Sequence, residues 1–195
     1  EREWVACHLY ADGELVLTLD PEPEEGREVS LSSRMCATAR YRAIGSRAWD
    51  YAGVDVLKAT FSEDLSGLTY ANLSYWFYTD GEMAEVAGLS NLPEVREMRY
   101  AFSSCDGLTE LDLSGFPTEG LTDLFYCFSG CSNLATIWAD ADWSLPAGCE
   151  GSGMFYDCEA LVGGAGTTYD SGGRDEEYCR IDDPPVAPGY LTVKG

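Results

Sequence analysis

The chain has 195 residues and 45% of them are hydrophobic, so the composition excludes a disordered polar segment and predicts a folded domain. The formal net charge is −22, from 34 acidic and 12 basic residues with no cluster of Lys or Arg, which excludes nucleic acid and anionic membrane surfaces as expected partners. No apolar run approaches the roughly 18 residues of a membrane-spanning helix, so we expect no transmembrane segment.

Residues 1–53 predict a β-rich N-terminal cap. Residues 4–10 and 15–19 are rich in apolar and aromatic side chains, and Asp12-Gly13 between them is a strong turn signal, so the two segments predict a β-hairpin. A further strand is expected near residues 28–35. Such a unit would cover the apolar end of a repeat array that follows it.

A short phrase returns three times in the middle of the chain. Phe102, Phe128 and Phe155 follow one another at steps of 26 and 27 residues, and each is followed by Cys after three residues and by Leu after six. Self-similarity with a period of roughly 20 to 50 residues is typical of repeat proteins, in which neighbouring units bury one another. The repeated positions predict a core ladder: Phe102, Cys105, Leu108, Phe128, Cys131, Leu134, Phe155, Cys158 and Leu161.

Weaker copies of the phrase come earlier. Phe77 lies 25 residues before Phe102, with Asp80 where the Cys is expected, and residues 54–73 resemble an opening unit. We therefore expect about four leucine-rich-type repeats over residues 54–161.

Each unit is expected to contain one short strand. Leu111 and Leu113 alternate with polar residues, which is the period of a half-buried strand, and Gly, Ser, Thr and Pro dominate the remainder. The expected fold is a leucine-rich-repeat-like solenoid, with short parallel strands and irregular or short helical return segments. Its outward strand positions form a candidate binding face: Glu110, Asp112, Ser114, Thr136, Trp138 and Asp140.

Trp138 is the strongest single candidate on this face. A Trp among polar outward positions offers a large apolar area and one hydrogen-bond donor, as binding hot spots do. The alternative is a structural role, in which Trp138 covers a strand edge against Trp143.

Residues 162–195 break the period and predict an irregular C-terminal cap. Gly163, Gly164 and Gly166 interrupt the pattern, and a short apolar stretch returns only at residues 190–193. The two caps and the repeats are expected to form one continuous structural domain.

The cysteines favour packing over chemistry. Cys105, Cys131 and Cys158 recur at one position of the repeat, where a thiol packs as a small apolar group, and Cys127 is also expected in the core. Cys7, Cys36, Cys149 and Cys179 could form disulfides, of which Cys7 with Cys36 is the favoured pair. Zinc is not expected, because no Cys-x2-Cys pair exists and His8 is the only histidine.

The sequence predicts no enzyme, no catalytic residue and no bound cofactor. His8 has no motif that links it to a cysteine nucleophile, and no carboxylate pair stands out among the 34 acidic residues. Calcium is the one ion left open, because Asp140 with Asp142 and Asp182 with Asp183 gather oxygen ligands, although neither pair has the spacing of a known calcium loop.

The repeat also carries a family resemblance. Leu-Thr-Glu-Leu-Asp-Leu-Ser-Gly-Phe at 108–116 and Cys-Phe-Ser-Gly-Cys-Ser-Asn-Leu at 127–134 resemble the BspA-like leucine-rich-repeat surface proteins of bacteria, in the subgroup with repeats of about 26 residues. Further stretches that resemble this family are residues 10–16, 73–78, 161–170 and 188–192. The chain departs from the family at Asp80, which replaces a Cys, and at Cys127, which stands where Met is usual.

The resemblance implies a secreted or cell-surface protein with a role in adhesion. The expected function is an extracellular interaction module that presents one face to a host or bacterial surface protein or to a glycan. The alternative is a structural spacer without a ligand of its own. The ligand, the oligomeric state and the mode of surface attachment stay open at this point.

Overall fold

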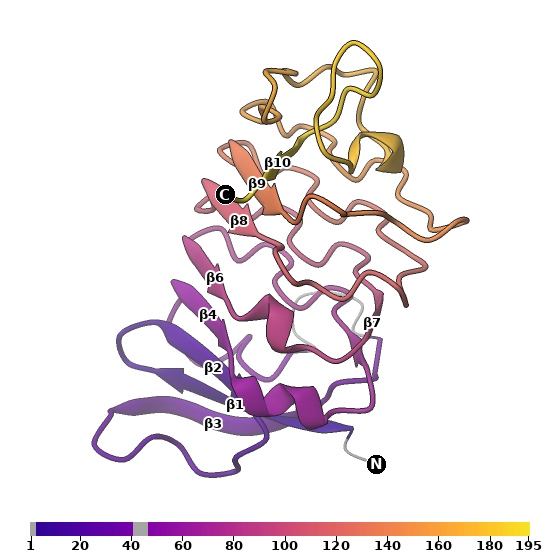
Figure 1. The fold of residues 1–195 in the computed structure, drawn as a ribbon. Coiled ribbons are helices and arrows are strands. Elements are labelled where there is room, and N and C mark those ends of the chain that lie inside the picture. The colour runs from indigo at the N-terminus through magenta and orange to yellow at the C-terminus, as the bar shows by residue number, and fades with distance from the viewer. Residues whose placement is uncertain (1–2, 41–46) are drawn as a thin grey trace.

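The computed structural model describes residues 3–40 and 47–195. Within these ranges the chain forms ten β-strands and three short 3-10 helices, and no α-helix (Figure 1). The 3-10 helices are η1 (Glu63–Gly67), η2 (Leu89–Asn91) and η3 (Glu176–Tyr178).

The largest sheet has five strands in the order β3-β1-β2-β4-β6 and mixes antiparallel and parallel pairing. Its strands are β1 (Trp4–Tyr10), β2 (Glu14–Thr18), β3 (Val29–Cys36), β4 (Lys58–Phe61) and β6 (Glu85–Ala87). The predicted hairpin is confirmed, because β1 and β2 pair antiparallel around a turn at Gly13, whose φ of 85° suits glycine. β3 also pairs antiparallel with β1, whereas β2, β4 and β6 run parallel to one another.

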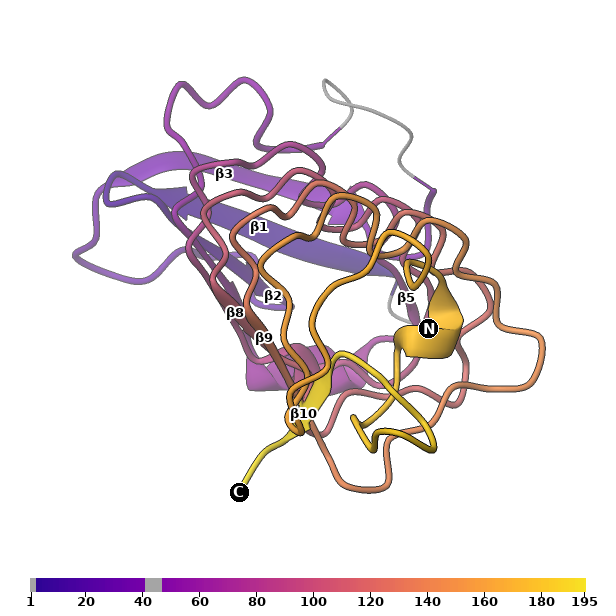
Figure 2. The same cartoon turned by 90° about the horizontal axis from the view of Figure 1, so that it is seen from above.

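Two smaller sheets are parallel throughout. The first has the order β10-β9-β8, with β8 (Glu110–Asp112), β9 (Thr136–Ala139) and β10 (Leu191–Val193). The second pairs β5 (Ala71–Asn72) with β7 (Val95–Glu97). Strands β4, β6, β8, β9 and β10 follow one another along one side of the molecule (Figure 1), and the view from above places β8, β9 and β10 together on that side (Figure 2).

The predicted leucine-rich-repeat-like solenoid is wrong. The five-stranded sheet is mixed and is not a parallel stack of repeats, and the ten strands are divided among three sheets. The physical reason is that the N-terminal hairpin does not cap a separate array: its strand β2 pairs with β4 and so completes the same sheet. The division of the chain at residues 53 and 161 stays a prediction.

The repeated phrase builds the centre of the core. The rings of Phe77, Phe102, Phe128 and Phe155 stack in sequence at centroid distances of 5.4, 5.8 and 5.9 Å, and all four side chains are buried. The nine residues that the repeat places in the core ladder are all at most 1% exposed. Adjacent segments are also joined through the backbone, as where the amide of Phe102 donates to the carbonyl of Cys127 at 2.9 Å.

The recurring cysteines tie each Phe segment to the preceding one. The thiols of Cys105, Cys131 and Cys158 donate to the carbonyl oxygens of Phe77, Phe102 and Phe128 at 3.1, 3.0 and 3.0 Å. Burial raises the pKa of the Cys131 thiol to about 12, so the group stays protonated and keeps its role as a donor at neutral pH. The ladder cysteines are therefore structural thiols.

A row of tyrosines runs beside the buried Phe stack. Tyr75, Tyr100 and Tyr126 each lie two residues before a Phe, and their rings stack at 5.1 and 5.3 Å. All three have positive φ angles of 52° to 64°, a conformation that bulky residues rarely adopt. The same position in the next segment is Gly153, where an added Cβ would lie 2.6 Å from the Tyr126 ring. The ring stack and the lateral backbone hydrogen bonds therefore hold the chain in this strained turn.

Candidate binding face

The outward side chains of β8 and β9 lie together because the two strands are parallel and in register. Leu111 and Ile137 point into the core, so the residues on either side of them point outward. The register pairs Glu110 with Thr136 and Asp112 with Trp138, and Trp138 in turn with Thr192 of β10. We call the outward residues Glu110, Asp112, Thr136, Trp138 and Thr192 the outer face.

Trp138 lies at the centre of the outer face. Its side chain is half-buried, and the indole Nε1 donates to Glu110 Oε2 at 3.1 Å. The alternative role at a strand edge against Trp143 is wrong, because β9 is the central strand of its sheet. Trp143 stacks instead on Phe116 at 6.5 Å and donates its indole N–H to the carbonyl of Cys179 at 3.0 Å.

Asp112 and Lys194 form an ion pair at the margin of the outer face. Partial burial alone would raise the pKa of the Asp112 carboxyl, but hydrogen bonds from Lys194 and from the Ser114 amide outweigh it and hold the pKa below its ordinary value. Asp112 is therefore a carboxylate at neutral pH, and it offers a partner both charge and acceptor oxygens.

The structure places two of the six predicted face residues elsewhere. Ser114 follows the end of β8, where its amide donates to Asp112 Oδ1 at 2.9 Å. Asp140 follows the end of β9, and its Oδ2 accepts a hydrogen bond from the Gly115 amide at 2.6 Å. Both residues shape the turns that leave the strands, and the remaining four belong to the outer face together with Thr192.

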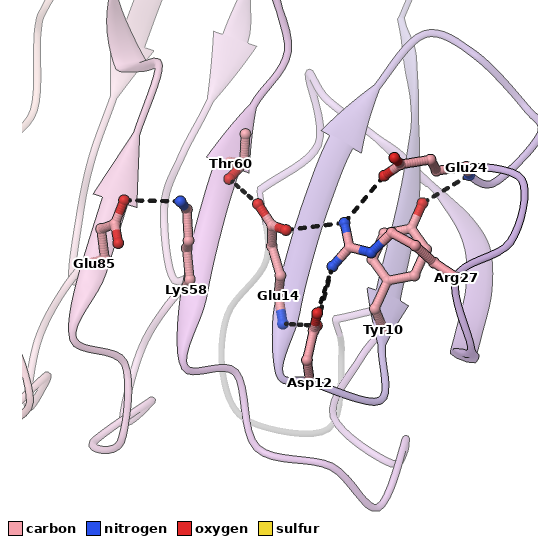
Figure 3. Close-up of polar contacts among 8 residues, drawn as sticks. All are labelled: Tyr10, Asp12, Glu14, Glu24, Arg27, Lys58, Thr60 and Glu85. Carbon is pink, nitrogen blue, oxygen red and sulfur yellow. Dashed lines mark hydrogen bonds and ion pairs between the residues drawn. The ribbon is translucent and has the colours of Figure 1, made fainter.

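The neighbouring five-stranded sheet carries a polar cluster that the sequence analysis missed (Figure 3). The Arg27 guanidinium lies 3.7 Å above the Tyr10 ring and forms ion pairs with Asp12, Glu14 and Glu24 at 2.8, 2.9 and 3.2 Å. Thr60 donates to Glu14 at 2.6 Å, and Lys58 pairs with Glu85 at 2.9 Å. Every one of these carboxylates faces a cation, although the four carboxylates outnumber the two cations. No spacing in the sequence points to the cluster.

A second missed cluster is buried around Arg47. Its guanidinium pairs with Asp50 at 2.5 Å and with Asp80 at 3.0 Å, and it donates to the carbonyls of Trp76 and Tyr78 at 2.9 and 3.1 Å. Asp80 is the residue that replaces Cys in the repeated phrase, so the ladder of thiols ends in a buried ion cluster. The cluster borders a hollow of about 450 Å³, and the Arg47 guanidinium that contributes to its lining already donates to Asp50, Asp80 and two backbone carbonyls.

Asp80 predicts a measurable pH dependence of stability. Burial raises its pKa to about 6, although the Arg47 cation opposes the shift, while an unfolded Asp titrates near 3.9. The folded state therefore binds the proton more tightly, so this contribution to stability is full below about pH 4 and is lost as the pH rises through about 6. We therefore expect the free energy of unfolding, measured with urea, to fall less between about pH 4 and about pH 6 for Asp80→Asn than for the wild type.

The control for this pH dependence is Glu159→Gln, which removes an exposed carboxylate at the surface. It should keep the wild-type slope of unfolding free energy against pH. Equal slopes for Asp80→Asn and the wild type would show that Asp80 does not titrate in this range.

The favoured disulfide between Cys7 and Cys36 is wrong. The register pairs Cys7 with Ser33 and Cys36 with Trp4, which separates the two cysteines by three positions along the strands, and Cys7 is a free thiol. Cys7 is buried and its pKa is raised to about 12.

His8 lies on the same strand, and its ring nitrogens contact Ser32 Oγ at 2.9 Å and the carbonyl of Asp20 at 3.1 Å.

The two carboxylate pairs considered for calcium are not converging ligand sets. Within residues 3–40 and 47–195, no group of three or more His, Cys, Asp or Glu side chains could hold a metal ion. Asp182 accepts hydrogen bonds from the amides of Ala165, Thr167 and Gly189 and from the Thr167 hydroxyl, so its oxygens organise the C-terminal loops. Asp140 and Asp142 line a groove described below.

None of the helices in the described residues has the length and apolar character needed to span a bilayer. No family model matches the chain, and the searches among curated proteins and solved structures found no match.

Proposed function

We propose that this protein is an extracellular interaction module that presents the outer face to a protein or glycan at a cell surface. The observation that carries the proposal is Trp138, a half-buried indole on a central strand whose N–H is oriented by Glu110 at 3.1 Å. Large aromatic side chains on a preorganised surface are typical centres of binding energy. The resemblance to BspA-like surface proteins supports the location, and family membership stays a prediction.

The composition of the outer face also favours recognition. Its carboxylates and hydroxyls, from Glu110, Asp112, Thr136 and Thr192, surround the indole in the way that polar rims surround interface centres. Parallel pairing on both sides of β9 holds these groups on a rigid support, so little conformational entropy is lost on binding.

Replacement of Trp138 by Ala tests this function. We expect saturable binding to a member of a panel of extracellular-matrix proteins, mucins and glycans, measured at about 0.15 M salt to suppress non-specific attraction to a protein of charge −22. The variant should lose at least about 2 kcal/mol of binding free energy while its melting temperature stays nearly unchanged, because the side chain is only half-buried.

The matched control is Trp4→Ala, since Trp4 is 54% exposed on β1 and lies outside the outer face. It should bind like the wild type. A large drop in the melting temperature of Trp138→Ala would make Trp138 a structural residue. No saturable binding across the panel would favour the structural spacer over the interaction module.

A further inference from the structure

A groove opens where the chain leaves strands β8 and β9. The segments that follow the two strands run side by side and enclose a hollow of about 700 Å³, lined by residues 115–119 on one side and by Asp140 and residues 142–146 on the other. A second hollow of about 320 Å³ shares Pro117 and Glu119 with it and reaches Pro93 and Glu94. The two hollows therefore adjoin at Pro117 and Glu119 and together offer more room than a single ion needs.

The groove is held in shape by contacts within its own walls. The Gly115 amide donates to Asp140 Oδ2 at 2.6 Å and so fastens one wall to the other. Trp143 is fixed at both ends, because its amide donates to the Asp140 carbonyl at 3.0 Å and its indole N–H donates to the Cys179 carbonyl at 3.0 Å. One face of the Trp143 ring stacks on Phe116, so the ring stands as a rigid, half-buried wall. A preformed surface of this kind binds at a low cost in conformational entropy.

The charges of the groove have one sign. Among the residues that the structure describes, its lining includes the carboxylates of Glu119, Asp140 and Asp142 and no Lys, Arg or His. Glu119 and Asp142 are exposed and take part in no ion pair within the described part of the chain. This distinguishes the groove from the cluster around Arg27, where each carboxylate faces a cation. A cation against an aromatic ring and between carboxylates gains both cation–π and Coulomb energy.

We propose that this groove binds a basic peptide segment, with the cationic head of an Arg or Lys side chain against the Trp143 ring and facing the carboxylates of Glu119 and Asp142. Three observations support this occupant: the carboxylates of Glu119 and Asp142 outside any ion pair of the described residues, the rigid aromatic wall, and the adjoining second hollow that reaches Pro93. The proposal does not rest on the outer face, because Trp138 does not line the groove.

The test uses the full chain and a capped hexapeptide of alternating Gly and Arg, titrated by calorimetry at about 0.15 M salt. We expect saturable one-site binding, and weaker binding by at least about tenfold for the double variant Glu119→Gln/Asp142→Asn. Trp143→Phe keeps an aromatic ring but lowers the cation–π attraction, so it should weaken binding by a few-fold. The peptide with citrulline in place of Arg has the same shape without the charge and should not bind.

The matched control is Glu22→Gln/Glu25→Gln, which removes the same charge from exposed positions outside the groove. It should bind the peptide within about twofold of the wild type. Equal weakening by the two double variants would show that only the overall field of the protein attracts the peptide, and would overturn the proposal. Equal binding of the citrulline peptide, or no saturable binding of the Arg peptide, would overturn it as well. Trp138→Ala should bind the peptide like the wild type. The two experiments therefore distinguish a failure of the outer-face proposal from a failure of the groove proposal.

Discussion

Arg47→Ala is expected to lower the free energy of unfolding by about 3 to 5 kcal/mol, the range for removing one partner from a buried ion pair. The Arg47 side chain is 3% exposed, and the side chains of Asp50 and Asp80 that it pairs with are 0% and 14% exposed. The variant leaves both carboxylates in the interior without this cation. It also removes the donors to the carbonyls of Trp76 and Tyr78. Urea unfolding at neutral pH measures the loss.

The pH dependence of this loss separates the electrostatic effect from lost packing. Burial raises the pKa of Asp80 to about 6, so at a pH near 4 this carboxyl is protonated in the wild type and its ion pair with Arg47 is lost; the deficit of the variant should therefore shrink. Arg96→Ala is the control, because Arg96 is 48% exposed and pairs with Glu94 at the surface. An exposed pair of this kind contributes at most about 1 kcal/mol. If Arg47→Ala cost no more than Arg96→Ala, the buried cluster would not stabilise the fold.

Phe128→Ala is expected to cost about 3 to 5 kcal/mol of unfolding free energy, the usual range for truncating a buried Phe. The ring is 1% exposed and lies between Phe102 and Phe155, at centroid distances of 5.8 and 5.9 Å. Truncation opens a cavity in the middle of the stack, so each neighbour loses one of its ring contacts. The loss is a large fraction of the roughly 5 to 15 kcal/mol that stabilise a typical domain.

Two further variants provide reference values for this loss of unfolding free energy. Phe128→Leu keeps most of the apolar volume and should cost clearly less than the Ala variant. Tyr156→Ala removes a ring that is 40% exposed at the end of the same region, so it should cost about 1 kcal/mol or less. Similar losses for Phe128→Ala and Tyr156→Ala would mean that the Phe stack does not form the centre of the core.

The predictable parts of the structure are those that follow from a regular spacing of hydrophobic residues along the sequence. Period-2 alternation around Leu111 predicted a strand, which is present as β8, and the turn at Gly13 predicted the hairpin. The recurrence of Phe, Cys and Leu predicted which side chains are buried. The same recurrence contained an unused signal, because Tyr75, Tyr100 and Tyr126 also recur two residues before each Phe.

The parts that were not predictable depend on contacts between distant segments with no common period. The pairing of β2 with β4 joins Glu14 to Lys58 and makes the large sheet mixed, which contradicts the solenoid expected from the repeats alone. The groove was missed for a related reason, since Phe116 and Trp143 look like isolated apolar residues until two parallel strands bring them to 6.5 Å.

The sequence by itself determined that the recurring Phe, Cys and Leu residues are buried, because burial follows hydrophobic period. It also determined that Trp138 points outward, because the residues two positions away, Thr136 and Asp140, are polar. Only the tertiary structure decided which sheet each strand joins and which charges meet. The cation of Arg47 reaches Asp80 from 33 residues away, and its choice of partner depends on the space and backbone acceptors of the folded interior. Long-range electrostatic and edge-strand pairings are properties of three-dimensional packing, so the order of residues does not display them.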